Sequence, residues 1–258
     1  MKSKRVVLKL GGSSLQDPTV LRKVIETIRG YRKYDYSVIL VHGGGPVINE
    51  ELTKRGITWN FINGQRQTTE EMISVIEEVL VNRINRQLVE DLNQARIPAV
   101  GFSGAEAETL FCEQSNPELG LVGKITNVNT VWIERLMAAT GSVVPVIAPI
   151  GIGLNKEKYN INADWAASKL AAALKAEKLI FLTDQPGILG ANGSLISSAN
   201  PGELDLLVES KVVSGGMYTK VLTAIEALKC GVPQVRVMSG RESENGLWSD
   251  YIGTLAHV

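Results

Sequence analysis

Histidine and cysteine are scarce in this chain. Two of each occur among its 258 residues, namely His42, His257, Cys112 and Cys230. Such low counts argue against a histidine-rich metal site, a four-cysteine zinc site and a disulfide framework. The cysteines fit a reducing compartment, in which they are expected to be plain buried thiols.

An excess of charge of either sign is also missing. The chain has 27 Lys and Arg against 27 Asp and Glu, with 44% hydrophobic residues, which is typical of a globular protein. A neutral balance gives no support for a nucleic-acid binder. No apolar run approaches the roughly 18 residues of a membrane span. The apolar run at residues 6–10 is too short for a signal peptide, so a cytoplasmic location is expected.

Glycine, by contrast, is plentiful, with 25 residues. Three glycine-rich turns follow apolar runs, at Gly11-Gly12, at Gly43-Gly44-Gly45 and at Gly215-Gly216. In open α/β sheets ligands bind beyond the carboxyl ends of the strands, and glycine lets backbone N–H groups approach an anion. The three turns predict a site for several anionic groups, although each alone could merely permit a tight turn.

Strands and helices are expected to alternate along the chain. Short apolar runs predict strands at residues 6–10, 37–41, 98–102, 143–147, 178–183 and 234–238. Helical spacing predicts helices from Asp17-Pro18 to Gly30, from Pro46, from a capping box at Thr68 and Glu71, over 164–176 and over 216–229. This alternation predicts an α/β fold with a mainly parallel sheet covered on both faces.

Two segments, 111–129 and 189–201, are rich in turn residues and predict hairpins or loops. No polar linker interrupts the chain, so two lobes on one continuous sheet are expected, 1–177 and 178–258, with their join near Lys178.

The familiar phosphate-binding motifs do not occur. Gly123-Lys124 lacks the upstream glycine and the following Ser or Thr of a P-loop. Gly43-x-Gly45 is followed by Ile48 where a dinucleotide fingerprint needs glycine. A nucleotide site of another architecture is left open.

Four charged residues stand near the glycine turns. Lys9 lies in a strand, where a charge is costly unless it meets an anion, and Lys220 follows Gly215-Gly216 by about one helical turn. Asp164 begins a helix, where it is either the N-cap or the carboxylate that orients the two lysines. Arg66 precedes a helix and can clamp a carboxylate or be solvated.

Taken together, these motifs resemble the amino-acid kinase family, over essentially the whole chain and in family order. The motifs that carry the resemblance are Lys9-Leu10-Gly11-Gly12, His42-Gly43-Gly44-Gly45-Pro46, Asn63-Gly64-Gln65-Arg66, Asn160-Ile161-Asn162-Ala163-Asp164, Thr183-Asp184-Gln185-Pro186-Gly187-Ile188-Leu189, and Gly215-Gly216-Met217 with Lys220. The residues Ala105-Glu106 depart from the Gly-Lys-Asp-like sequence common at that place.

The resemblance implies roles for individual residues. Lys9 and Lys220 would stabilise the transferred phosphoryl group and Asp164 would organise them. Gly44, Gly45, Arg66 and Asn160 would hold an acetylated amino acid. The ATP site would comprise Gly11, Gly12, Asp184, Gln185, Pro186, Gly187, Ile188, Leu189, Val212, Val213 and Ser214.

The resemblance also implies a reaction and an assembly. It points to members that use ATP and Mg²⁺ to phosphorylate the side-chain carboxylate of N-acetyl-L-glutamate in arginine biosynthesis. The implied fold is a three-layer αβα sandwich, whose first lobe binds the amino acid and dimerises while the second binds the nucleotide. Mg²⁺ would be held mainly through the phosphates, with no protein ligand. Because little sequence precedes the first strand, an arginine-insensitive homodimer is expected.

Carboxylate phosphorylation suits a chain with little histidine, because a carboxylate with a pKa near 4.3 is already ionised at pH 7 and needs no general base. His42 is therefore interpreted as a turn-orienting residue, with a substrate contact as the alternative. Sibling kinases of aspartate, N-acetyl-aminoadipate, glutamate, carbamate or a phosphate monoester remain open. A nucleotide- or amino-acid-sensing binding protein on the same fold is the non-enzyme alternative.

Overall fold

The computed structural model describes residues 4–12, 15, 17–62, 64–140, 143–241 and 252–258. The chain divides into two compact units. Unit 1 comprises Met1–Ile39 with Ala167–Val258, and unit 2 comprises Leu40–Ala166. The expected lobes, 1–177 and 178–258 with a join near Lys178, stay a prediction.

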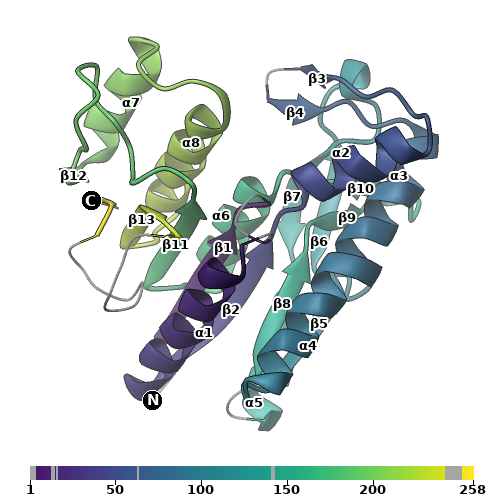
Figure 1. Cartoon of the computed structure of the whole chain (residues 1–258), viewed down its shortest axis with the longest axis horizontal. Helices are drawn as coiled ribbons and strands as arrows, with labels where there is room; N and C mark the ends of the chain where they lie inside the picture. Colours follow the sequence, from purple (N-terminus) through teal and green to yellow (C-terminus); the bar gives the residue numbers. More distant parts are fainter. Residues whose placement is uncertain (1–3, 13–14, 16, 63, 141–142, 242–251) are drawn as a thin grey trace. The chain divides into compact units, whose positions relative to one another are not determined.

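The largest sheet has eight strands and is mainly parallel, which confirms the expected α/β class (Figure 1). Within unit 1 the strand order is β12-β14-β13-β11-β1, and within unit 2 it is β2-β8-β5. The pair β13–β14 is antiparallel, whereas β1–β11, β11–β13, β12–β14, β2–β8 and β5–β8 are parallel. The strand bounds are β1 (Lys4–Leu10), β2 (Tyr36–His42), β5 (Ala99–Ser103), β8 (Val144–Ala148), β11 (Lys178–Thr183), β12 (Ser198–Ala199), β13 (Gln234–Ser239) and β14 (Thr254–His257).

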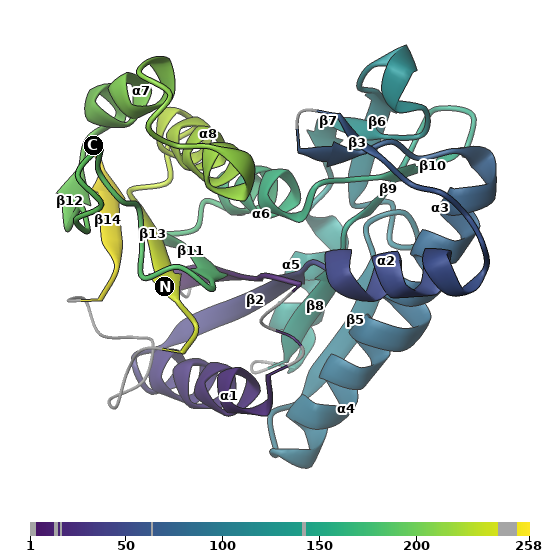
Figure 2. The same ribbon diagram turned by 45° about the horizontal axis from the view of Figure 1, so that its top comes forward.

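All six expected strands are present. Most are apolar runs buried on both faces, whereas in β5 Val100 is half-buried and Gly101 is exposed. In β1, for example, Val6, Val7 and Leu8 are completely buried. The strands β12 and β14 were not expected. They are short and pair with each other, and β14 also pairs with β13 (Figure 2).

The helices include the five that were expected and two, α5 and α7, that were not. Figure 1 shows α3, the π-helical segment η2 and α4 as one continuous helical rod. The bounds are α1 (Pro18–Lys33), α2 (Gly45–Lys54), α3 (Glu70–Glu77), η2 (Glu78–Asn85), α4 (Arg86–Gln94), η3 (Pro117–Leu119), α5 (Val131–Thr140), α6 (Ala163–Ala173), α7 (Pro201–Glu209) and α8 (Gly215–Lys229).

Two helix-boundary predictions were wrong. Gly30 does not end α1, which runs on to Lys33; Gly30 is buried on the packed face of the helix. The residue with positive φ after this helix is Asp35 instead, at +59°. The capping box at Thr68 is also absent, because Thr69 is the N-cap and accepts a hydrogen bond from the Met72 N–H.

Smaller sheets complete unit 2. The four-stranded order is β10-β9-β6-β7, where β6 (Leu110–Gln114) and β7 (Gly123–Val128) form an antiparallel pair that confirms the expected hairpin. The other strands are β9 (Ile150–Ile152), β10 (Lys158–Asn160), β3 (Phe61–Ile62) and β4 (Gln65–Arg66). In unit 1 the turn-rich segment after Ile188 contains an antiparallel bridge between Leu189 and Leu195.

Across the described residues, no helix combines the length and apolar character that crossing a membrane requires.

The unexpected helix α7 starts with a complete capping box. The Asn200 side chain accepts from the Glu203 N–H at 3.0 Å, and the Glu203 carboxylate accepts from the Asn200 N–H at 2.8 Å. Asn200→Ala should therefore lower the free energy of unfolding by about 1 kcal/mol, measured by urea denaturation. Asn200→Ser keeps a capping oxygen and should stay within about 0.5 kcal/mol of the parent. Equal losses in both variants would contradict the capping role.

Candidate active site

In unit 2, Arg66 occupies the most unusual position among the predicted site residues. It ends β4, yet only 6% of its surface is exposed. Its Nη2 donates to the Gly45 carbonyl oxygen at 3.4 Å and to the Asn49 side chain, both on α2. The rings of Trp59 and Phe61 lie over the guanidinium, with centroids 5.2 and 4.7 Å from Cζ. Arg66 is therefore fixed against the first turn of α2.

The Arg66 charge has no carboxylate partner within the described part of the chain. Burial alone lowers the pKa of its guanidinium to about 10, which leaves it fully charged at pH 7. Its Nη1 is buried and finds no hydrogen-bond partner among the described residues. An uncompensated buried cation is unfavourable, and the described residues supply no anion to compensate this one.

A hydrogen-bond chain connects Arg66 to Asn160. The Thr68 hydroxyl donates to the Arg66 carbonyl oxygen at 3.0 Å and accepts from the Asn160 side-chain amide at 3.1 Å. The Leu121 N–H also donates to the Thr68 carbonyl oxygen at 2.7 Å. Three predicted site residues, Gly45, Arg66 and Asn160, are thus brought together in unit 2.

The glycine turn after β2 leads directly into α2. Gly44 is the N-cap residue and Pro46 lies in the first turn, as the sequence predicts. A Cβ on Gly44 would lie 2.6 Å from the Leu80 side chain, so this glycine allows close packing. A Cβ on Gly45 would meet nothing within 4 Å. The backbone N–H groups at this helix start suit an anion.

His42, at the end of β2, is completely buried. Its Nδ1 lies 3.0 Å from the Gly43 carbonyl oxygen and its Nε2 lies 3.1 Å from the Asn85 side-chain nitrogen. These contacts agree with the turn-orienting interpretation.

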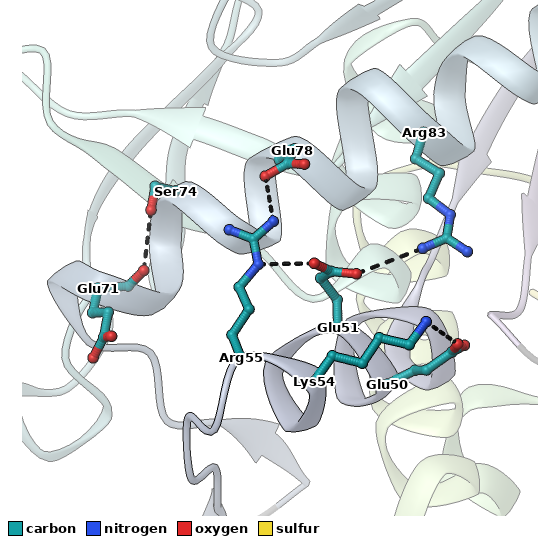
Figure 3. A network of polar contacts seen from close by, with 8 residues as sticks. All are labelled: Glu50, Glu51, Lys54, Arg55, Glu71, Ser74, Glu78 and Arg83. Atoms are coloured by element: carbon teal, nitrogen blue, oxygen red, sulfur yellow. Dashed lines mark hydrogen bonds and ion pairs between the residues drawn. The ribbon is translucent and has the colours of Figure 1, made fainter.

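Ion pairs connect α2 with the helical rod that packs beside it (Figure 3). Arg55, the C-cap residue of α2, pairs with Glu51 on α2 and with Glu78 on η2, each at 2.8 Å. Arg83 reaches Glu51 at 3.8 Å. Exposed pairs contribute little singly, but this connected set restrains the helix that begins at Gly45.

Asp164 is not the N-cap of α6. The Asn162 side chain takes that role and accepts from the Asp164 and Trp165 N–H groups at 2.9 and 3.4 Å. Asp164 lies in the first turn with 4% of its surface exposed. Its carboxylate is therefore not needed as a capping group, and the helix N-terminus favours its charge.

In unit 1, Lys9 and the first glycine turn lie beside the end of β11. Lys9 is 6% exposed and is paired with Phe181 in the parallel register of β1 and β11. The Gly11 N–H donates to the Leu182 carbonyl oxygen at 3.1 Å, while Gly12 follows the strand. This arrangement puts Lys9 and the glycine turn at the carboxyl end of β1, where ligands bind in such sheets.

The segment predicted to line the nucleotide continues from β11. Its first residues, Asp184 and Gln185, are exposed, and Pro186 and Leu189 are half-buried. Gly187 and Ile188 are buried, and the Ile188 N–H donates to the Thr254 hydroxyl at 2.8 Å. The strand β14, which sequence analysis missed, therefore supports this segment.

A second predicted nucleotide-lining stretch precedes α8. Val212 and the buried Val213 donate backbone bonds to the Leu207 carbonyl oxygen, at 3.1 and 3.4 Å, and Ser214 is the N-cap of α8. Lys220 lies one turn into α8 and contacts the Gly216 carbonyl oxygen at 3.4 Å. Lys9 and Lys220 thus belong to unit 1 and Asp164 to unit 2, so the role that joins all three stays a prediction.

Sequence reasoning missed the residues that surround the predicted site. Asn49 follows Gly45 by one helical turn, and Trp59 and Phe61 alternate along an extended segment before β4. A spacing of four residues on a helix, or of two in an extended segment, places two side chains on the same face. Residue pairs with these spacings are also common on protein surfaces, so the sequence alone does not single them out. In the Asn63–Arg66 motif, Asn63 lies outside the described residues.

Comparison with known proteins identifies the family. Residues 4–239 match the model of the amino acid kinase family, and the chain belongs to this family.

Several relatives match nearly the whole chain. A protein of Geobacillus kaustophilus called acetylglutamate kinase is 40% identical over 95% of this chain and 94% of its own length. One of Ruegeria pomeroyi with the same name is 37% identical over 92% of this chain and 82% of its own. Among solved structures, smu.665 of Streptococcus mutans superposes with a TM-score of 0.85 at 25% identity, covering 98% of both chains.

Replacing Arg66 by an apolar residue should stabilise the unliganded protein. Arg66→Met removes a buried cation, and the free energy of unfolding at pH 7 should rise by about 1 kcal/mol. Because the folded-state pKa lies near 10, below the usual 12.5, the penalty is complete below pH 10 and fades above it. Urea denaturation at pH 7 and pH 11 measures both effects.

Arg86→Met is the matched control for this experiment. Arg86 is exposed and bonds Glu90 at 3.1 Å on the same helix, so its replacement should change the unfolding free energy by less than about 0.5 kcal/mol. A loss above 1 kcal/mol in Arg66→Met would mean that the guanidinium is satisfied by its own surroundings.

Proposed function

We propose that this chain transfers the γ-phosphoryl group of ATP to the side-chain carboxylate of N-acetyl-L-glutamate, in arginine biosynthesis. The products are ADP and N-acetyl-L-glutamyl 5-phosphate. The observation that carries the proposal is the buried Arg66 guanidinium, which faces no carboxylate of the described chain. Relatives called acetylglutamate kinase, 37–40% identical over nearly the whole chain, support the choice of substrate.

The acceptor site is proposed at the start of α2. Arg66 would bind one carboxylate of the acetylated amino acid through its free Nη1, in a charge-assisted hydrogen bond. Backbone N–H groups at Gly44 and Gly45 would bind the reacting end, and open space beside Gly45 leaves room for it. Asn160, which the Thr68 hydroxyl orients, would bind the amide group.

The chemical step needs charge compensation rather than proton transfer. The acceptor carboxylate is ionised at pH 7, and its oxygen attacks the γ-phosphorus while the bond to the β-phosphate oxygen breaks. Lys9 and Lys220 would lower the repulsion between the two anions, and Asp164 would orient the lysines. One such charge pair contributes about 4 kcal/mol at ~4 Å and an effective dielectric constant near 20.

The nucleotide is proposed to lie at the carboxyl ends of β1 and β11. Gly11 and Gly12 would approach its phosphates, while residues 184–189 and 212–214 would line the rest. Mg²⁺ would enter with ATP, held mainly through the phosphates, and would add further charge compensation. The described residues contain no group of three acidic, His or Cys side chains that could hold a metal ion by themselves.

A cytoplasmic homodimer is the proposed state of the protein. The two cysteines, Cys112 and Cys230, are both free, which suits a reducing compartment. Cys112 is buried as expected, whereas the expectation of a buried thiol was wrong for Cys230, which is exposed near the end of α8. The dimer follows from the family resemblance, and light scattering of the purified protein tests it.

A substrate panel tests the proposed reaction directly. Hydroxylamine traps acyl phosphates, so ATP, Mg²⁺ and N-acetylglutamate should give a hydroxamate, and unacetylated glutamate and aspartate should give far less. N-acetyl-aminoadipate is the most demanding competitor, because one methylene changes binding by only ~1–3 kcal/mol. The absence of product with N-acetylglutamate would reject the proposal. A higher kcat/KM with another substrate of the panel would make that compound the proposed substrate instead.

The lysines should matter for turnover much more than for binding. Lys9→Ala and Lys220→Ala should each lower kcat by about 100-fold or more, because each removes charge stabilisation of the transition state. The KM for either substrate should change by only a few-fold. Steady-state kinetics measure both effects.

Lys229→Ala is the matched control. Lys229 lies on the same helix as Lys220 and pairs with Asp205 at 3.5 Å on the surface, so its kcat should equal that of the parent. Near-normal turnover in the Lys9 or Lys220 variant would remove that residue from the proposed mechanism.

A further inference from the structure

We infer that Asn85, the last residue of η2, is a positioning residue for the substrate loop, defined as Gly43–Gly45. Its side-chain amide holds the His42 ring and the middle of β8 together and thereby sets the orientation of the loop that follows His42. The inference rests on the proposed function, because that function assigns the acceptor to this loop.

Asn85 bridges two neighbouring strands with one side chain. It is 3% exposed, and its Nδ2 lies 3.1 Å from His42 Nε2 and 3.0 Å from the Val146 carbonyl oxygen. β2 and β8 are parallel here, with Val41 opposite Ile147. The amide therefore joins the carboxyl end of β2 to the body of β8 beside it.

The directions of these hydrogen bonds define one histidine tautomer. The Gly43 carbonyl oxygen can only accept, so His42 Nδ1, 3.0 Å away, carries the proton and donates to it. His42 Nε2 then accepts from Asn85, whose second N–H donates to the Val146 oxygen. A proton on Nε2 instead would face the amide donor. The amide thus selects the tautomer that bonds to the first residue of the loop.

The same helical segment also fits the loop by shape. A Cβ on Gly44 would lie 2.6 Å from Leu80 Cδ2 and 2.7 Å from Ile84 Cδ1, both on η2. A Cβ on Gly101 would lie 1.9 Å from Asn85 Oδ1, so a side chain there would displace the amide. π-Helical turns often occur at functional sites, and here the segment packs against both the loop and β5.

Asn85→Asp separates hydrogen bonding from shape, because it keeps the size of the side chain and replaces both donors by acceptors. The KM for N-acetylglutamate should rise about tenfold through misplacement of the loop, while the KM for ATP stays within twofold. Asn93→Asp is the matched control on α4. The Asn93 side-chain oxygen accepts from the Ala99 N–H at 3.1 Å, which aspartate retains, and aspartate loses the longer bond from Nδ2 to the Ala99 carbonyl oxygen at 3.4 Å. Since neither bond involves His42 or β8, both KM values should stay within twofold.

The histidine ring supplies a readout that needs no turnover. The chain has only two histidines, so ¹⁵N-histidine NMR gives two rings, and His257→Gln assigns the signals of His42. The parent protein should show His42 neutral with its proton on Nδ1. Asn85→Asp should move the proton to Nε2 or protonate both nitrogens, and Asn93→Asp should leave the ring unchanged.

The two readouts separate the possible failures. If the parent does not phosphorylate N-acetylglutamate, the proposed function fails, and the ring tautomer still decides whether Asn85 sets His42. An unchanged tautomer, or an unchanged KM for N-acetylglutamate in a folded Asn85→Asp variant of an active parent, overturns the inference. Should Asn85→Asp fail to fold, Asn85→Ser replaces it in the KM measurement with the same expected rise, because a hydroxyl is too short to bridge both strands.

Discussion

The buried positive charge of Arg66 is the constraint around which unit 2 is organised. A guanidinium at 6% exposure, with no described carboxylate beside it, is unfavourable on its own. Its surroundings keep it there: Asn49 and the Gly45 carbonyl oxygen hold one nitrogen, and Trp59 and Phe61 cover the plane. Nη1 has no hydrogen-bond partner among the described residues, and under the proposed function a bound anion would offset the cost of burying this charge.

A neutral chain has to make positive potential locally. The proposed site would do this with a lysine in the buried run of β1, an arginine against the start of α2, and backbone N–H groups at helix starts. Each source is desolvated or pre-oriented, so little reorganisation is needed when charge moves during the proposed reaction. This explains why the formal net charge carried no information about the ligands.

The sequence predicted the parallel sheet well, because strands buried on both faces must be continuous apolar runs, as β11 is. It predicted boundaries less well. Glycine often ends a helix, which is why Gly30 was expected to end α1. It lies inside the helix instead, on the buried face, where close packing favours a residue without a side chain. Thr68 had a capping pattern, yet its hydroxyl bonds the Arg66 carbonyl oxygen and Asn160 instead. In both cases tertiary contacts outweigh a local signal that was correct in itself.

The glycine excess has more than one physical origin, and only part of it could be predicted. Gly45 leaves open space at a helix start, and the anion-binding role that the turn pattern suggested for it stays a prediction. Gly44 and Gly101 are glycine because Leu80 and Asn85 occupy the space of their side chains. That second reason depends on the π-helical register of η2, which has no marker in the hydrophobic spacing because its apolar residues also fit an ordinary α-helix. A residue such as Asn85 becomes visible only when the strands that it joins are known.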